Sequence, residues 1–87
     1  MKAQSFYSPN KSLLISLSKE LKSIRKAKGL TIEDLSDKAG LHEKYIQTIE
    51  RNHRNISISV FVQIAKALNV SAPNILAKAM KAKAQPS

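Results

Sequence analysis

The stretch HEKYIQTIE, residues 42–50, combines a helical apolar spacing with polar side chains that could contact another molecule. Ile46 and Ile49 recur at the spacing of one helix face and are expected to turn inward. The polar positions near the start of the helix then face outward, because residues three and four apart share a face. Their side chains are of types that contact the edges of DNA bases, and they are our candidate base-reading residues: His42, Glu43, Lys44, Gln47 and Thr48.

The chemistry of these side chains assigns each a partner. Lys44 can donate to O6 and N7 of guanine, and Glu43 can accept from N4 of cytosine. Gln47 can pair with adenine, while Thr48 offers a methyl group to thymine. For Glu43 a second interpretation stays open, because a carboxylate at a helix N-terminus is also favoured by the helix dipole alone.

The element that must position these side chains is a pair of short helices. Residues 31–51, TIEDLSDKAGLHEKYIQTIER, predict helices at 32–39 and 43–51 from their apolar spacing. Gly40 lies between them and lets the chain turn through a left-handed conformation at little cost. Two helices around such a turn have the shape of a DNA-reading unit.

The residues before the two helices are candidate N-caps. Thr31 can cap the first helix, and Asp34 three residues later forms an approximate capping box with Asp in place of Glu or Gln. His42 stands at the cap position of the second helix, where it is chemically weak.

Three more helices are predicted around this pair. Spacings of three and four residues predict a helix over 11–28, ended by Gly29. Residues 58–68 keep a helical spacing, although ISISV within them alternates like a strand, and Ser71 can cap a fifth helix at 72–79. The expected core residues of the first and fourth helices are Leu14, Leu17, Leu21, Ile24, Ile58, Phe61, Ile64, Ala65 and Leu68.

The whole chain is long enough for one small domain. We predict an all-α, five-helix domain over residues 11–79, with an N-terminal arm at 1–10 and a basic tail at 80–87. Such small chains are marginal as monomers, so burial against a partner is plausible.

The net charge of +9 suggests a polyanionic partner. All six acidic residues lie between positions 20 and 50, and no acid follows Arg51. Charge alone does not separate DNA from RNA, an acidic protein or an anionic membrane, and solubilising lysines would give the same composition.

The sequence lacks the residues and motifs that mark several classes of function. There is no cysteine, and two histidines eleven residues apart do not make a metal site. No catalytic grouping or glycine-rich phosphate loop is present, so we expect neither an enzyme nor a cofactor nor a small-molecule ligand. No apolar run approaches the length of a membrane span, which predicts a soluble cytoplasmic protein without a membrane partner.

Between residues 17 and 76 the chain resembles the Cro and C1 repressor type of helix-turn-helix domain, often called the XRE family. The matching residues are L-x3-L-K-x-I-R-K-A-K-G-L-T-x-E-D-L-S-x-K-A-G-L-x-x-x-Y-I-x-x-I-E-R, then R-N-I-S-I and I-A-K-A-L-N-V-S. The run IERNHRNISI is most similar to the controller proteins of restriction-modification systems. The resemblance implies a Cro/C1-repressor-like DNA-binding domain whose second motif helix enters the major groove of double-stranded DNA.

The sequence departs from the family pattern at three positions. Ile32 stands where many members carry a Gln that touches a phosphate, and its side chain cannot donate a hydrogen bond. Ser36 replaces a small Ala between the two helices, which is tolerable if its hydroxyl finds a backbone carbonyl. His42 replaces the usual Ser, Thr or Asp cap.

Further roles follow from the resemblance. An ion pair between Arg25 and Glu50 would lock the base-reading helix onto the first helix. Phosphate contacts, which position a protein without carrying sequence information, are expected from Thr31, Tyr45, Arg51, Asn52, Arg54 and Asn55.

The resemblance also implies a symmetric homodimer on paired half-sites. The expected interface is formed by apolar residues in the C-terminal part, although the fifth helix could simply pack on its own core: Val70, Ile75, Leu76 and Met80.

The leading hypothesis is a transcriptional regulator that represses its own promoter from a palindromic operator and can activate a neighbouring gene through a contact with RNA polymerase. The alternatives are an antitoxin that binds both DNA and a protein toxin, and a phage-type repressor. An RNA-binding role is weakened by the lack of surface aromatic residues for stacking on bases.

Overall fold

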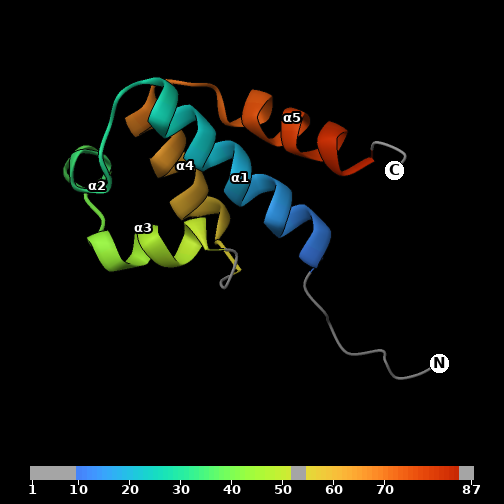
Figure 1. The fold of residues 1–87 in the computed structure, drawn as a ribbon, viewed down its shortest axis with the longest axis horizontal. Coiled ribbons are helices and arrows are strands. Elements are labelled where there is room, and N and C mark those ends of the chain that lie inside the picture. The colour runs from blue at the N-terminus through green and yellow to red at the C-terminus, as the bar shows by residue number, and fades with distance from the viewer. Residues whose placement is uncertain (1–9, 52–54, 85–87) are drawn as a thin grey trace.

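The structure, a computed structural model, describes residues 10–51 and 55–84. These residues fold into five α-helices joined by short connections, and no strand occurs among them (Figure 1). The all-α prediction is therefore confirmed, including the helix that begins within ISISV. The helices are α1 (Lys11–Ala27), α2 (Ile32–Ala39), α3 (Glu43–Glu50), α4 (Ile58–Leu68) and α5 (Ala72–Ala84).

The start of α2 is fixed by hydrogen bonds between residues close in sequence. Thr31 Oγ1 accepts from the backbone N–H of Asp34 at 3.0 Å, and Asp34 Oδ2 accepts from the backbone N–H of Thr31 at 2.9 Å. This capping box satisfies two of the donors that a helix start leaves unpaired. The backbone hydrogen bond from Thr31 also lowers the pKa of the Asp34 carboxyl below its ordinary value.

Left-handed residues end α2 and α4. Gly40 follows α2 with φ +68°, a conformation in which a residue without a Cβ is unstrained. Asn69 follows α4 with φ +60°, which Asn tolerates better than most residues. The turn predicted at Gly40 is therefore confirmed.

The fifth helix is longer than the sequence indicated. It continues to Ala84, five residues beyond the predicted end at Ala79. Residues 80–84 contain no Gly or Pro, and Ala and Lys are good helix formers, so nothing in the sequence stops the helix. Ala79 is 1% exposed and holds this part of α5 against the core.

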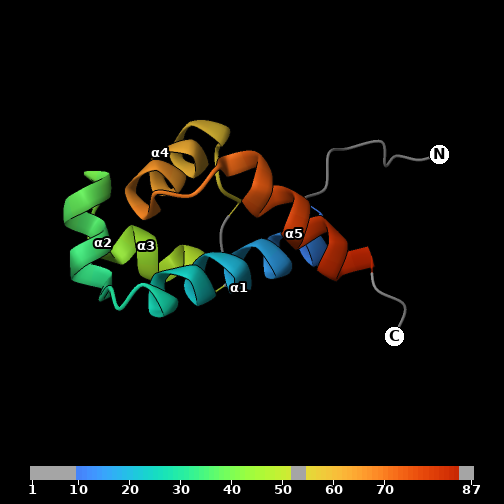
Figure 2. The same ribbon diagram turned by 90° about the horizontal axis from the view of Figure 1, so that it is seen from above.

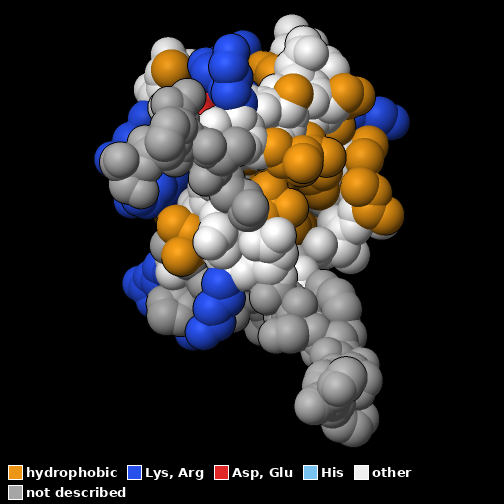
Figure 3. Space-filling view, turned by 90° about the vertical axis from the view of Figure 1, so that its right-hand side faces the viewer, with side chains coloured by type: hydrophobic (Ala, Val, Ile, Leu, Met, Phe, Trp, Pro, Cys, Tyr) orange, Lys and Arg blue, Asp and Glu red, His pale blue; other side chains and the backbone are white. Residues whose placement is uncertain are grey.

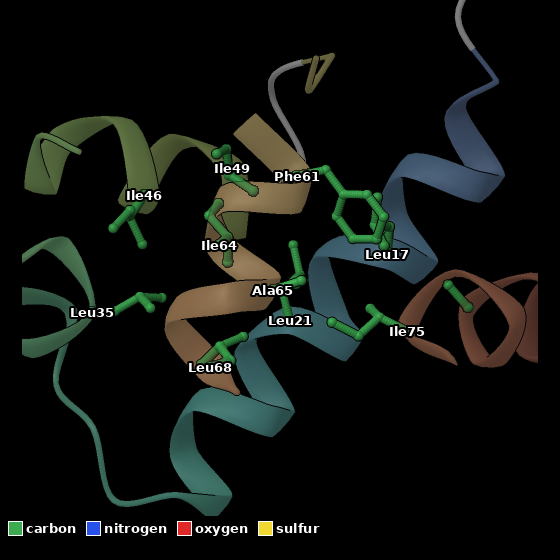
Figure 4. Packing of buried hydrophobic residues seen from close by; sticks show 11 residues of the cluster. Leu17, Leu21, Leu35, Ile46, Ile49, Phe61, Ile64, Ala65, Leu68 and Ile75 are labelled. Carbon is green, nitrogen blue, oxygen red and sulfur yellow. The ribbon is translucent and has the colours of Figure 1, made fainter. Parts of the chain in front are cut away.

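The core lies between α1, α4 and the inner face of α5, and α2 and α3 close one end of it (Figures 1 and 2). α1 packs along α5, whereas α3 contacts α1 and α2, and α2 also packs on α4. Close packing of these helices, shown in Figure 4, fixes where α3 lies. The buried cluster comprises Leu17, Leu21, Leu35, Ile46, Ile49, Phe61, Ile64, Ala65, Leu68, Ile75 and Ala79.

Two apolar residues of α4 and α5 differ from the expectation. Ile58, predicted to be in the core, is 72% exposed, because it lies in the first turn of α4 on the flank of the buried stripe. Ile75, expected at a dimer interface, is 1% exposed and belongs to the chain's own core. Within the described ranges no single helix is long and apolar enough to span a membrane, and α4 and α5 meet that description only together, bent by 106°.

Candidate nucleic-acid interface

The C-terminal end of α3 is held by an ion pair from α1. Arg25 donates from Nε to Glu50 Oε2 at 2.7 Å and from Nη2 to Oε1 at 3.0 Å, which is the bidentate geometry that matches a guanidinium to a carboxylate. The third nitrogen, Nη1, donates to the carbonyl of Leu30 at 2.7 Å. The side chains of Arg25 and Glu50 are only 8% and 6% exposed. The ion pair implied by the resemblance is thus present, and its two charges are withdrawn from solvent.

The charge of Arg25 is stabilised by this ion pair. The hydrogen bond from Arg25 to Glu50 raises the pKa of the guanidinium above its ordinary value, although burial acts in the opposite direction. Arg25 therefore remains charged over the whole physiological pH range.

A second hydrogen bond ties α3 to α1. Ser18 Oγ donates to the backbone carbonyl of Ile49 at 2.7 Å, and Ser18 is 4% exposed. The carbonyls in the last turn of a helix lack partners within the helix, so a buried one requires a donor from elsewhere. This contact was not predicted from the sequence. The available signal was a hydroxyl on the core-facing stripe of α1, directly after Leu17.

The N-terminal end of α3 is capped by His42. Its Nδ1 accepts from the backbone N–H of Lys44 at 3.1 Å, so the predicted cap forms. The preceding turn is tied to α4 by Gln63, whose Nε2 donates to the carbonyl of Ala39. With Nδ1 as acceptor, the neutral imidazole carries its proton on Nε2, which can donate outward.

The five candidate base-reading residues surround two adjoining concavities. One is lined by His42, Glu43, Lys44 and Gln47 together with Ser36 of α2. The other is lined by His42, Lys44, Tyr45 and Thr48. His42 and Lys44 border both, so the side chains predicted from the sequence form one continuous surface at the start of α3.

Comparison with known proteins shows the family of this domain. Residues 21–74 match the helix-turn-helix family model, a span that contains α2, α3 and α4. The chain belongs to the Cro/C1-type helix-turn-helix family. Among curated relatives, control protein C.SmaI of Serratia marcescens is 39% identical over 62 residues, which cover 71% of this chain and 74% of the relative.

Solved structures of restriction-modification controller proteins are similar to this helix-turn-helix protein. The controller protein C.Esp1396I, solved as a tetramer in complex with its natural 35-base-pair operator, is 40% identical, with a TM-score of 0.77 over 84% of this chain and 96% of that one. The controller protein C.AhdI from Aeromonas hydrophila is 32% identical, with a TM-score of 0.69 over 71% and 94%. The chain is therefore a DNA-binding transcriptional regulator of a non-enzymatic family.

The candidate phosphate-binding residues of this helix-turn-helix regulator are spread over several elements. Thr31 caps α2, Tyr45 is half-buried against the core, and Arg51 is exposed just after α3. Asn55 is exposed before α4. The remaining two, Asn52 and Arg54, lie outside the described residues.

Two of the positions at which the sequence differs from the family pattern lie in α2, and the structure shows the surroundings of both side chains. Ile32 is half-buried and packs against the core, so its apolar side chain has a structural use. Ser36 is 9% exposed, and within the part of the chain that the structure describes its hydroxyl makes no hydrogen bond to a backbone carbonyl. The carbonyl partner considered for Ser36 is thus not found there, and the residue borders the concavity beside His42 and Gln47 instead.

Replacing Glu50 by Ala should destabilise the helix-turn-helix domain by about 3 to 5 kcal/mol, because Arg25 would be left buried without a counter-charge. Urea unfolding followed by circular dichroism measures this, and Glu20→Ala is the control. Glu20 makes only a long ion pair with Lys78, at 3.7 Å, whose lysine is 74% exposed. A Glu50→Ala midpoint equal to that of wild type would show that the ion pair does not anchor α3.

Proposed function

We propose that this regulator binds a palindromic operator as a homodimer, represses its own promoter at high occupancy and serves as the controller of a restriction-modification system. The observation that carries the proposal is the similarity to C.Esp1396I, which extends over nearly the whole of that operator-bound protein. Because its ligand is the cell's own DNA, the regulator acts inside the cell. Activation of a neighbouring gene would add a contact with RNA polymerase.

Base recognition is assigned to the start of α3. Lys44 is exposed and borders both concavities, so its ammonium group can donate to O6 and N7 of a guanine. Thr48 Oγ1 donates to the carbonyl of Lys44 at 2.8 Å, which leaves its methyl group to contact a thymine. His42, with Nδ1 occupied as an acceptor, can donate from Nε2 to an acceptor in the groove.

The base-reading side chains at the start of α3 cover too few base pairs for one subunit to bind an operator alone, so we infer a dimer. Helix α3 has eight residues, and only its first turns carry base-reading side chains, so one subunit covers a few base pairs. Two subunits related by a two-fold axis would place their α3 helices in successive major grooves, about 34 Å apart. The palindrome of the operator mirrors that symmetry.

The proposed dimer surface is apolar and lies away from the base-reading side chains. Figure 3 shows hydrophobic side chains gathered on the end of the molecule opposite the α2–α3 pair. Large apolar residues of α4 and α5 are exposed, namely Ile58 at 72%, Met80 at 52% and Val62 at 37%. Burial of such side chains against a second copy would be favourable by roughly 1.5 to 3 kcal/mol for each residue fully buried.

This surface revises the interface expected from the sequence. Val70 and Leu76 are half-buried against the core, and Met80 is exposed as the prediction required. Ile75 is taken up by the core of its own subunit. We therefore remove Ile75 from the interface, keep Val70, Leu76 and Met80, and add the exposed Ile58 and Val62 of α4.

The wild-type protein should bind DNA from its own upstream region far more tightly than random duplex of equal length. Lys44→Ala should relax the preference at one base pair of each half-site, since it removes a base contact. Arg51→Ala should weaken binding to all sequences alike, because a phosphate contact carries no sequence information. Fluorescence anisotropy with both duplexes measures these affinities, and equal wild-type binding to the two would refute the specific-regulator proposal.

Analytical ultracentrifugation at tens of micromolar tests the dimer. The wild-type protein should sediment as a dimer and Ile58→Glu as a monomer, because a charge placed in an apolar interface must be desolvated. Ile15→Glu on α1 is the matched control, since Ile15 is also an exposed isoleucine, at 39%. A monomeric wild type, with and without DNA, would exclude the proposed assembly.

A further inference from the structure

A groove beside the reading surface is lined mainly by cationic side chains. It runs between α1 and the C-terminal half of α3, and Ile32 at the start of α2 forms an apolar part of its wall. The polar residues that line it are Lys22, Arg25 and Lys26 from α1, Gln47 and Glu50 from α3, and Arg51 just after α3.

The groove carries unneutralised positive charge. Its single carboxylate, Glu50, is fully engaged by the two nitrogens of Arg25. The exposed cations Lys22, Lys26 and Arg51 make no ion pair with any of the residues 10–51 and 55–84. Three like charges around one concave surface repel each other, and an anion between them would relieve that repulsion.

The position of the groove identifies the anion. Gln47 lines both this groove and the concavity that contains the base-reading side chains, so the two surfaces are continuous. A helix about 10 Å across fills a major groove that is about 12 Å wide, which brings the sugar-phosphate strands to both sides of the helix. If α3 lies in the major groove as proposed, the strand along its α1 side would pass the groove lined by Lys22 and Lys26.

We propose that this groove binds a phosphate of the DNA backbone at the edge of each half-site, with Lys22 and Lys26 of α1 as donors beside Arg51. The inference rests on the proposed function and adds a helix to the DNA-binding surface, since α1 carried none of the expected phosphate contacts. It also links the two tasks of α1. Arg25 holds α3 in place, and its neighbours at Lys22 and Lys26 hold the DNA strand that passes α3.

The test measures operator affinity at several salt concentrations for Lys22→Gln/Lys26→Gln. The matched control is Lys66→Gln/Lys81→Gln, which removes the same charge from exposed lysines of α4 and α5 outside the groove. If each subunit of a dimer loses its one phosphate contact, the log–log slope should become shallower by roughly 2. The control slope should stay near wild type, because distant charges are screened beyond about 8 Å at physiological salt.

The ratio of the affinity for the protein's own upstream region to the affinity for random duplex distinguishes the outcomes further. The groove variant should weaken both duplexes by a similar factor and keep its urea midpoint, since both lysines are exposed. A slope equal to that of the control variant, in a background where wild type still prefers its own upstream region, would overturn the groove assignment alone. If wild type shows no such preference, the proposed function fails and the groove assignment fails with it.

Discussion

The bidentate ion pair between Arg25 and Glu50 is the interaction on which the proposed base-reading surface at the start of α3 depends. Helix α3 has eight residues, which is too short to be stable in isolation. Its direction must therefore be set by contacts with the rest of the fold. The guanidinium holds the carboxylate at the last residue of α3 and simultaneously holds the carbonyl of Leu30 before α2. One buried side chain thus fixes both helices of the motif against α1.

Three faces of α1 serve three purposes. Leu17 and Leu21 point into the core and pack the helix against α4 and α5. Ser18 and Arg25 reach α3, one to the carbonyl of Ile49 and the other to Glu50. Lys22 and Lys26 are exposed and line the groove beside the candidate base-reading side chains. A rigid helix can do all three because residues on different faces are held in a fixed relation to one another, which is how supporting contacts place a binding surface accurately.

The helices were predictable because their signals are local. Thr31 with Asp34 and the glycine at position 40 define the ends of α2, and the apolar spacing in α3 correctly placed Ile46 and Ile49 inside. The burial of individual flank residues was not predictable in the same way. Periodicity gives the direction of the apolar stripe but not how far a neighbouring helix covers it. Ile58 fits the helical spacing yet lies beyond the edge of the packed surface, whereas Ile75 is covered completely.

At the candidate site, too, the contacts between residues far apart in the sequence could not be predicted from helical spacing. The base-reading candidates were found because helical geometry alone turns them outward. The hydrogen bond from Ser18 to Ile49 joins residues 31 positions apart, so a hydroxyl on the core-facing side of α1 indicates only one of its two partners. The cationic groove likewise forms only when α1 and α3 are brought together.

The most direct test of this account is the DNA specificity of Glu50→Gln, measured in conditions where circular dichroism shows the variant to be folded. Loss of the carboxylate charge should loosen the orientation of α3 while leaving the side chains proposed to bind phosphates intact. We predict that the ratio of specific to random affinity falls by about tenfold or more, comparable to one mismatched base pair, while binding to random duplex is retained. An unchanged ratio in the folded variant would contradict the claim that this ion pair positions the reading helix.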